Sequence, residues 1–233
     1  MIIFCSDVHL HTGADHENTF FQFLNSIPAT TKAIFILGDL FEYWWNDDHQ
    51  DVIYESWETY FKNYHIPIYF LKGNRDFLCS NHFFKKTDLI LIPSASVLFA
   101  YGQKIALYHG DEPGLCDPKY QIARKIMRSG WVQYLYHQLP KKMQLQLAKK
   151  ARKKSNPPLA LSINYEEWIQ QQGSIDIIIH GHLHFQHSNK IKNTKIYQLG
   201  TWDHEQGSWL SLDLSGFKFH QFHKEISKHH VIK

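Results

Sequence analysis

Five short motifs rich in aspartate, histidine and asparagine combine residue types that could bind metal ions. They are Asp-Val-His at 7–9, Gly-Asp at 38–39, Gly-Asn-Arg-Asp at 73–76, His-Gly-Asp at 109–111 and His-Gly-His-Leu-His at 180–184. Carboxylate, amide and imidazole ligands without sulfur suit Mn²⁺, Fe²⁺, Zn²⁺ or Co²⁺. Two such ions, roughly 3.5–4 Å apart, can stabilise the attacking and leaving oxygens of a phosphoryl transfer. The motifs therefore predict a dinuclear site for phosphoryl chemistry.

Each motif directly follows an apolar run that predicts a buried strand. These runs cover residues 2–6, 33–37, 66–71, 104–108 and 176–179. Amphipathic stretches at 17–27 and 51–64 separate the first three runs and predict helices, which together is the pattern of an α/β fold. Because ligand sites in such sheets lie beyond the carboxyl ends of the strands, we expect the five motifs to converge.

Later parts of the chain are richer in predicted strands. Residues 97–108 form a predicted hairpin with a turn at Gly102, and further strands are predicted at 196–199, 209–214 and 217–222. An α/β start followed by β-rich layers predicts a sandwich of two mixed sheets flanked by helices.

Composition restricts the class of protein. The chain has 233 residues, of which 43% are hydrophobic and 20% charged, so it is a globular protein and not a disordered one. No apolar run approaches the ~18 residues of a membrane span, and the N-terminus lacks the pattern of a signal peptide. Three cysteines without a Cys-x-x-Cys pair exclude a disulfide framework and a zinc ribbon, and we expect a cytoplasmic protein.

Charge is unevenly distributed along the sequence. Residues 1–117 carry 7 basic and 15 acidic side chains, whereas residues 118–165 carry 11 basic and no acidic ones. The basic stretch predicts helices at 119–128, 130–139 and 141–154, with apolar side chains among the lysines and arginines. We expect residues 1–117 and 166–233 to form the core, and residues 118–165 to form a helical cap that holds acyl chains and contacts an anionic membrane surface.

In this order, the motifs resemble those of the calcineurin-like metallophosphoesterases. That family shares Asp-x-His, Gly-Asp, Gly-Asn-[His/Arg]-[Asp/Glu], a later His and Gly-His-x-His, and its fold is a two-sheet sandwich flanked by helices. The resemblance implies two divalent metal ions. One would be held by Asp7, His9 and His184 and the other by Asn74, His109 and His182, with Asp39 bridging them.

Residues 38–48 and 73–77 are similar to the UDP-2,3-diacylglucosamine pyrophosphatases of lipid A synthesis, which have an arginine at the position of Arg75. The resemblance implies Mn²⁺-dependent attack of water on the α-phosphate, giving UMP and 2,3-diacylglucosamine 1-phosphate (lipid X). It also implies a peripheral protein on the cytoplasmic face of the inner membrane of a Gram-negative bacterium. The implied substrate contacts are Asn74, Arg75, Asp117, Tyr120, Ser155 and His182. The chain departs from this pattern after Ser155, where Asn156-Pro157-Pro158-Leu159 replaces a segment with a substrate-contacting Asn and Lys.

Two residues are expected to assist the reaction. A guanidinium binds phosphate through two hydrogen bonds, so Arg75 suits neutralisation of the leaving β-phosphate, although it could instead pair with Asp76. Asp111 is expected to orient His109 through the free ring nitrogen, with a plain turn residue as the alternative. His180 could orient a neighbour in the same way or simply be buried.

Other functions fit part of the pattern. A phosphoesterase of the same fold could act on a different nucleotide or phosphodiester. A basic stretch with aromatic residues could also bind a nucleic-acid backbone. Pure nucleic-acid binding needs none of the five motifs, so we expect no nucleic-acid partner. A scaffold without activity is disfavoured because all seven expected ligand positions are filled.

Overall fold

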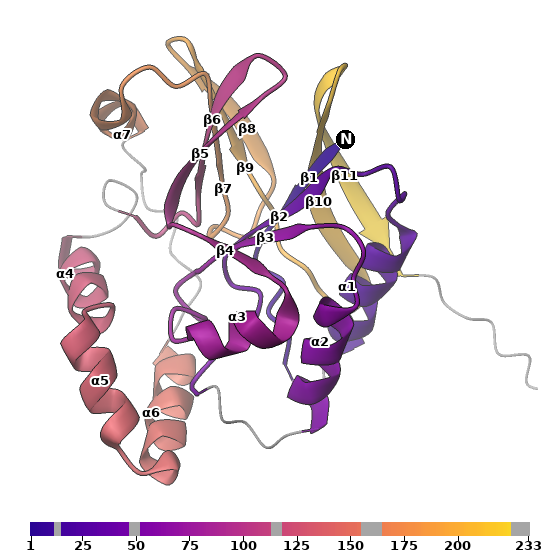
Figure 1. Cartoon of the computed structure of the whole chain (residues 1–233). Helices are drawn as coiled ribbons and strands as arrows, with labels where there is room; N and C mark the ends of the chain where they lie inside the picture. The colour runs from indigo at the N-terminus through magenta and orange to yellow at the C-terminus, as the bar shows by residue number, and fades with distance from the viewer. Residues whose placement is uncertain (12–14, 47–51, 113–117, 155–164, 225–233) are drawn as a thin grey trace, which may run out of the picture.

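The computed structural model describes residues 1–11, 15–46, 52–112, 118–154 and 165–224. In this part of the chain two β-sheets pack face to face, and helices cover their outer faces (Figure 1). The architecture is the layered α/β sandwich expected from the sequence, with all five predicted motif-bearing strands present.

The first sheet has six strands in the order β11-β10-β1-β2-β3-β4. Strands β1 (Ile2–Cys5), β2 (Ala33–Leu37), β3 (Ile68–Leu71) and β4 (Ile90–Ile92) run parallel, and β10 (Gln206–Asp213) and β11 (Gly216–His223) complete the sheet as an antiparallel pair. Helices α1 (Asp15–Ser26), α2 (Val52–Lys62) and α3 (Asn81–Thr87) connect the parallel strands. The carboxyl ends of β1, β2 and β3 therefore meet at one edge.

The second sheet has five strands in the order β5-β6-β7-β9-β8. Strands β6 (Gln103–Tyr108), β7 (Ile177–His180) and β9 (Thr194–Gln198) are parallel, while β5 (Ala95–Ala100) and β8 (His187–Ile191) are antiparallel edge strands. Helix α7 (Tyr165–Gln172) covers the outer face through the buried indole of Trp168, which packs edge-on against Tyr108.

Successive side chains of the buried strands alternate between two layers of the core. In β1, Ile2 and Phe4 belong to the layer between the two sheets, whereas Ile3 and Cys5 belong to the layer beneath α1 and α2. Successive side chains of a strand point to opposite faces, so a strand covered on both faces must be apolar throughout. This explains why the motif-bearing strands are short, continuous apolar runs.

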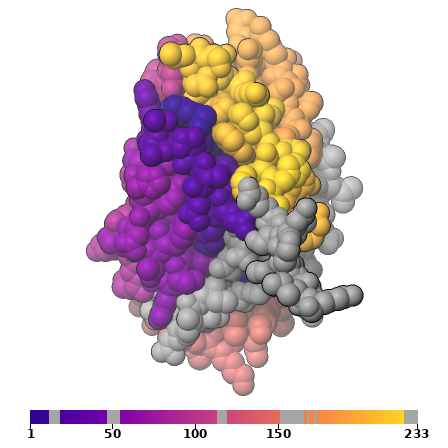
Figure 2. All heavy atoms as spheres, turned by 90° about the vertical axis from the view of Figure 1, so that its right-hand side faces the viewer, coloured from indigo at the N-terminus to yellow at the C-terminus, as the bar shows by residue number. Residues whose placement is uncertain are grey.

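The two ends of the described chain meet in the first sheet. Strand β1 pairs with β10, with Phe4 opposite Leu210. In Figure 2 the indigo atoms of the N-terminal part accordingly lie against the yellow atoms of the C-terminal strands. Strand β10, which follows the last motif in the sequence, thus pairs with β1, the strand that precedes the motif at 7–9.

The basic segment forms helices α4 (Pro118–Met127), α5 (Gly130–Gln138) and α6 (Lys141–Lys154), close to the predicted bounds. They project to one side of the sandwich (Figure 1). Whether they act as a separate cap stays a prediction. Among the described residues, the helices are too short or too polar for any of them to cross a bilayer.

Four elements have no counterpart in the sequence prediction: α3, β4, α7 and β8. Helix α3 has seven residues, and the Ser80 side chain caps it by accepting a hydrogen bond from the His82 backbone N–H. Strand β4 has three residues, and β8 is a largely exposed polar edge strand. Elements this short or this polar lack a hydrophobic period that distinguishes them from loops.

Replacing Phe20 by alanine tests the layer beneath α1. Phe20 is fully buried, and its ring lies edge-on to Trp202 with the centroids 5.0 Å apart. We expect Phe20→Ala to lower the free energy of unfolding by about 3–5 kcal/mol, measured by urea denaturation. Phe99→Ala is the control, because Phe99 is 74% exposed, and its effect should stay within about 0.5 kcal/mol. Equal losses in the two variants would contradict this assignment of the core.

Candidate metal centre

The first two motifs lie side by side at the ends of β1 and β2. The backbone N–H of Asp7 donates to the carbonyl of Gly38 (3.1 Å), and that of His9 donates to the carbonyl of Asp39 (3.0 Å). Both aspartate carboxylates are buried, with at most 1% of either residue exposed. Parallel pairing of β1 with β2 therefore places two carboxylates at one point between the sheets.

Left-handed backbone turns direct the site side chains inward. Asp7, His9, Asp39, His182 and His184 have φ angles between 50° and 71°, a region that residues other than glycine rarely adopt. Such strain persists only where surrounding contacts enforce it, and it clusters at functional sites. Five of the seven predicted ligands thus have an unusual backbone conformation, an observation that does not depend on their side-chain type.

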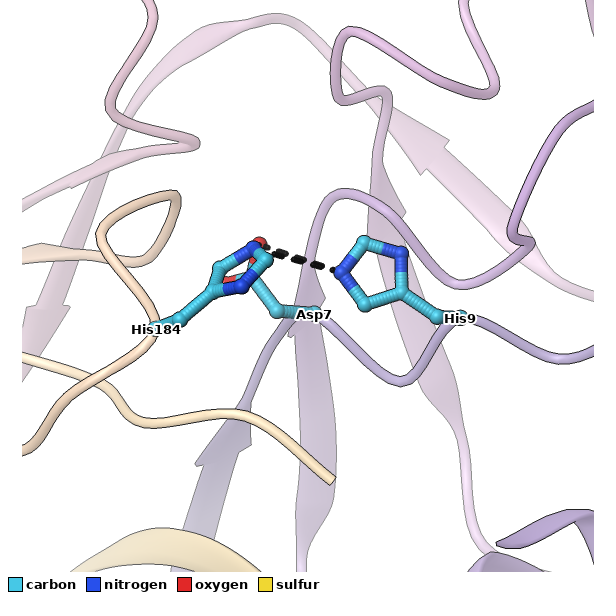
Figure 3. A group of neighbouring side chains, drawn as sticks. All are labelled: Asp7, His9 and His184. Carbon is cyan, nitrogen blue, oxygen red and sulfur yellow. Dashed lines mark hydrogen bonds and ion pairs between the residues drawn. The ribbon is translucent and has the colours of Figure 1, made fainter. Parts of the chain in front are cut away.

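Asp7, His9 and His184 form the first group that could hold a metal ion. The Nε2 atoms of the two imidazoles are 3.3 Å apart, and His184 Nε2 is 3.3 Å from Asp7 Oδ1. Figure 3 shows the two rings facing each other beside the Asp7 carboxylate. One donor atom from each residue lies within 4.8 Å of the others, so all three could contact a single ion.

Asp7, Asp39 and His109 form a second such group. His109 Nε2 is 3.5 Å from Asp39 Oδ1 and 2.9 Å from Asn74 Oδ1, which adds the predicted amide ligand to the cluster. Asp7 is common to both groups, whereas the sequence prediction gave the bridging position to Asp39. Asp39 belongs to the second group only, so its bridging role stays a prediction.

His182 lies next to this cluster without joining either group. Its backbone N–H donates to Asp7 Oδ2 (2.8 Å), and its ring lies edge-on to that of His109 with the centroids 5.1 Å apart. Burial lowers the pKa of His182 to about 4, so the imidazole is neutral and has a lone pair available for a cation. The structure therefore brings together the six other predicted ligands and leaves His182 adjacent to them.

The electrostatics of these residues fit a bound cation. Burial, together with the nearby carboxylates of Asp76 and Asp7, raises the pKa of Asp39 to about 7, although His109 acts in the opposite direction. Burial opposes protonation of His109, but Asp39 and Asp7 overcome it and raise its pKa to about 9. Packed carboxylates that destabilise one another, with imidazoles around them, form an oxygen and nitrogen donor set suited to divalent cations.

Asp76 holds the loops that carry the ligands, a role not predicted from the sequence. Its carboxylate accepts hydrogen bonds from the backbone N–H groups of Gly73 (2.6 Å) and Leu40 (2.8 Å). It thereby joins the loop of Asn74 to the loop of Asp39. The motif contained this aspartate, but only the structure distinguishes it from a ligand.

Asp111 does not orient His109, contrary to the sequence prediction. His109 Nδ1 bonds the carbonyl of Leu37 (2.8 Å), and its Nε2 faces Asn74, so both ring nitrogens have other partners. The Asp111 carboxylate instead accepts hydrogen bonds from Arg124 Nε (2.8 Å) and Arg128 Nη2 (3.2 Å). Although burial opposes ionisation, Arg128, His109 and Arg124 hold the pKa of Asp111 below its usual range.

Arg75 is paired with acidic residues other than Asp76. Its Nη1 donates to Glu42 Oε1 (2.9 Å), and its Nε lies 3.6 Å from Asp39 Oδ2. Glu42 also faces His9, with Oε2 3.4 Å from Nδ1. The alternative of an Arg75–Asp76 ion pair is therefore wrong, and Glu42 is a residue of the site that the sequence reasoning missed.

A cavity of about 210 Å³ adjoins the second group. It is lined by Asn74, Arg75, Asp111, Tyr120, Arg124 and Arg128, among others, and we call it the arginine pocket. Tyr120 donates to Asp111 Oδ2 (3.3 Å). Three guanidinium groups in one pocket indicate binding of an anion, and the sequence singled out only Arg75. The predicted contacts Asp117 and Ser155 lie outside the described residues.

The arginine pocket continues into a cavity of about 480 Å³ that we call the apolar groove. The two share Tyr43, Phe77 and Met127, and the groove is further lined by Leu135, Leu147 and other apolar side chains of α5 and α6.

Two aromatic residues near the motifs are buried outside these cavities. Trp44 is buried in the core and does not line the apolar groove. His180 is also buried, with its Nε2 facing the Tyr165 hydroxyl at 2.9 Å.

Comparisons with known proteins match nearly the whole chain. A sequence profile of the calcineurin-like phosphoesterases matches residues 1–186. A UDP-2,3-diacylglucosamine hydrolase of Histophilus somni is 34% identical over 93% of this chain and 97% of its own length. The protein of that name from Shewanella halifaxensis is 36% identical over 90% of this chain and 93% of its own.

Among solved structures, a novel archaeal phosphodiesterase aligns over 95% of this chain and 99% of its own, with a TM-score of 0.48 and 12% sequence identity. This is a distant likeness.

Removing one imidazole should weaken metal binding. We expect His184→Ala to lower the affinity for Mn²⁺ by at least about 10-fold, because it takes a donor from the first group. Elemental analysis after dialysis and calorimetric titration with Mn²⁺ measure the change. His82→Ala serves as the control, since His82 is exposed on α3. Metal binding equal to that of the unmodified protein would exclude His184 as a ligand.

Proposed function

Since this chain belongs to the calcineurin-like phosphoesterase family of metal-dependent hydrolases, we propose that its substrate is UDP-2,3-diacylglucosamine. Water attacks the α-phosphate, and the products are UMP and 2,3-diacylglucosamine 1-phosphate, a step of lipid A biosynthesis. Relatives that bear this activity in their name align along almost their entire length, which supports the same substrate here.

One observation carries the proposal: a metal-binding cluster, a cationic pocket and an apolar groove adjoin one another. Asn74 and Arg75 border the arginine pocket, and Tyr43 and Phe77 connect that pocket to the apolar groove. The proposed substrate has a diphosphate next to an acylated sugar. The diphosphate would lie at the metal-binding cluster and the arginine pocket, and the acyl chains would lie in the apolar groove. A soluble nucleotide alone would leave the groove without a function.

The residues of both groups fit two divalent metal ions, and we propose Mn²⁺. Asp7, His9 and His184 would hold one ion and Asn74, His109 and His182 the other, with Asp39 between them. When bound, the ions supply Lewis-acid polarisation of the phosphate and lower the pKa of water. Hydrogen bonds orient these ligands. The Leu37 carbonyl fixes the ring of His109, and the Asp76 carboxylate fixes the loops that carry Asp39 and Asn74.

Arg75 is proposed to neutralise the leaving β-phosphate. It sits where the ligand cluster meets the arginine pocket, and its side chain is held by Glu42 and Asp39. A phosphate monoester as leaving group needs its charge balanced more than it needs a proton, and a guanidinium stays charged throughout. Arg124 and Arg128 are anchored on Asp111 and line the same pocket.

The apolar groove is proposed to hold the acyl chains, with helices α4–α6 acting as the cap. Leu135 and Leu147 line the groove and are still 54% and 45% exposed, so apolar surface is available to a ligand. Burying it against acyl chains gains about 25 cal/mol per Å². Tyr120, His182, Asp117 and Ser155 stay proposed substrate contacts.

An assay of UMP release tests this function. We expect metal-dependent release from UDP-2,3-diacylglucosamine, and much slower release from the deacylated UDP-sugar, which cannot use the groove. Arg75→Ala should reduce kcat by about 10²-fold or more with unchanged metal content, because charge stabilisation at the leaving group is lost.

Arg75→Lys is the matched control and should retain part of the activity, since it keeps the charge but not the paired hydrogen bonds. Full activity of Arg75→Ala would refute the role of Arg75. No turnover of the acylated substrate, together with hydrolysis of soluble phosphodiesters, would refute the substrate.

We further propose that the protein is peripheral on the cytoplasmic face of the inner membrane. Exposed lysines at 119, 125, 141, 142, 149 and 150 lie on the same helices as the exposed Ile122, Trp131 and Tyr134. Basic groups next to exposed apolar side chains suit the surface of an anionic bilayer. A lipid substrate also requires access to a membrane.

Vesicle sedimentation tests this surface. We expect salt-sensitive binding to vesicles containing phosphatidylglycerol, reduced about 10²-fold when Lys141, Lys142 and Lys149 are changed to glutamine, since each contributes about 1 kcal/mol near an anionic surface. The matched control changes the exposed Lys190, Lys192 and Lys195 to glutamine and should bind normally. Equal loss in both triple variants would indicate a net-charge effect and refute the specific surface.

A further inference from the structure

A second polar cavity adjoins the metal centre at its other group. It has a volume of about 400 Å³, and His184, Thr201 and Ser208 are among the residues that line it. The Thr201 hydroxyl donates to the carbonyl of Asp7 (2.8 Å), so this wall is fixed directly to the first group. The arginine pocket, in contrast, borders Asn74 and Arg75. The polar cavity therefore borders the metal centre at His184, whereas the arginine pocket borders it at Asn74.

This cavity offers polar groups and one exposed aromatic ring. Its lining includes the side chains of Gln186, Gln206 and Gln221 but no lysine or arginine among the described residues. The one carboxylate in the lining, that of Asp203, accepts hydrogen bonds from the backbone N–H groups of Glu205 and Gln206 and would repel an anion. Amide groups both donate and accept hydrogen bonds, whereas phosphates are bound by cations. The lining thus suits an uncharged polar ligand and differs in kind from the arginine pocket.

Phe185 is positioned to stack on a flat ligand. It follows His184 directly, and 53% of it is exposed despite its place beside a metal-binding cluster. The Gln198 side chain holds its backbone by donating to the Phe185 carbonyl (2.8 Å). A fixed backbone with an uncovered ring provides a stacking platform for a base, as in proteins that bind single-stranded nucleic acids.

The floor of the cavity has room and an unused polar group. The Ser208 hydroxyl is buried and has no hydrogen-bond partner among the described residues. A Cβ atom on Gly200 would overlap the Ser208 oxygen, and one on Gly207 would overlap the indole of Trp202. Glycine at both positions therefore lets the backbone pack closely against these side chains and fixes the floor of the cavity. A buried hydroxyl without a partner costs free energy unless a ligand satisfies it.

We propose that this cavity binds the uridine of the substrate, with the uracil ring stacked on Phe185 and hydrogen-bonded by Ser208 and the glutamine amides. This inference rests on the proposed function, in which the α-phosphate lies at the metal centre. That phosphate has an ester bond to the nucleoside and an anhydride bond to the β-phosphate, which is the bond that hydrolysis breaks. Because the β-phosphate and the lipid occupy the arginine pocket and the groove, the nucleoside leaves the centre on the side of His184.

Equilibrium binding of UMP to the metal-loaded protein tests the cavity. We expect the unmodified protein to bind UMP more tightly than ribose 5-phosphate, which has no base. Phe185→Ala should weaken UMP binding by about 10-fold or more, as for loss of a stacked base, and should leave ribose 5-phosphate binding unchanged. Phe185→Tyr should retain UMP affinity, and Phe99→Ala, at an exposed phenylalanine of β5, should not alter it.

Inhibition by 2,3-diacylglucosamine 1-phosphate, which has no nucleoside, should be the same in Phe185→Ala and in the unmodified enzyme. Ser208→Ala should also weaken UMP selectively, with metal content and the thermal unfolding temperature retained. Unchanged UMP affinity in Phe185→Ala, in an enzyme that hydrolyses the acylated substrate, would overturn the inference and leave the proposed function intact. Absence of turnover in the unmodified protein would refute the proposed function, while UMP binding would still decide on the cavity.

Discussion

Two buried carboxylates at the ends of adjacent parallel strands constrain this structure more than any other interaction. Asp7 and Asp39 have almost no access to water, and unpaired buried charge is strongly unfavourable. The protein compensates by directing donors at them: the Ser6 hydroxyl and the His182 N–H at Asp7, and the Arg75 N–H at Asp39. Left-handed turns and glycines that could not accept a side chain, such as Gly181 beside Ser6, make these contacts possible. The parallel order of β1, β2 and β3 is the framework that brings these loops together.

Much of the centre was predictable because it depends on local signals. Each motif directly follows an apolar run, and the carboxyl ends of parallel strands meet, so sequence alone placed Asp7, Asp39 and Asn74 together. The prediction failed where a partner comes from a distant segment. Asp111 lies close to His109 in the sequence, yet its partners Arg124 and Arg128 come from α4 and the turn directly after it, and nothing local indicates that pairing. Glu42 was likewise missed, because its contacts with His9 and Arg75 join separate loops.

Charge is divided among the three cavities in a way that would orient a long, asymmetric substrate. Arginine side chains line the arginine pocket, mostly apolar side chains line the groove, and glutamine amides with one carboxylate line the cavity beside Phe185. An inverted substrate would place acyl chains against amides and a nucleoside against leucines, leaving polar groups unsatisfied at both ends. Specificity then arises as much from what each cavity excludes as from what it binds.

Arg128, the residue directly after α4, connects the end of this helix to the metal centre. Its Nη2 donates both to the Gly73 carbonyl (2.8 Å), in the loop that carries Asn74, and to the buried carboxylate of Asp111 (3.2 Å). Displacing α4 would leave that carboxylate without these counter-ions, and an unpaired buried charge is costly. A rearrangement of the cap that keeps these ion pairs would have to lie beyond Arg128, in α5 and α6, and would leave the loop of Asn74 in place.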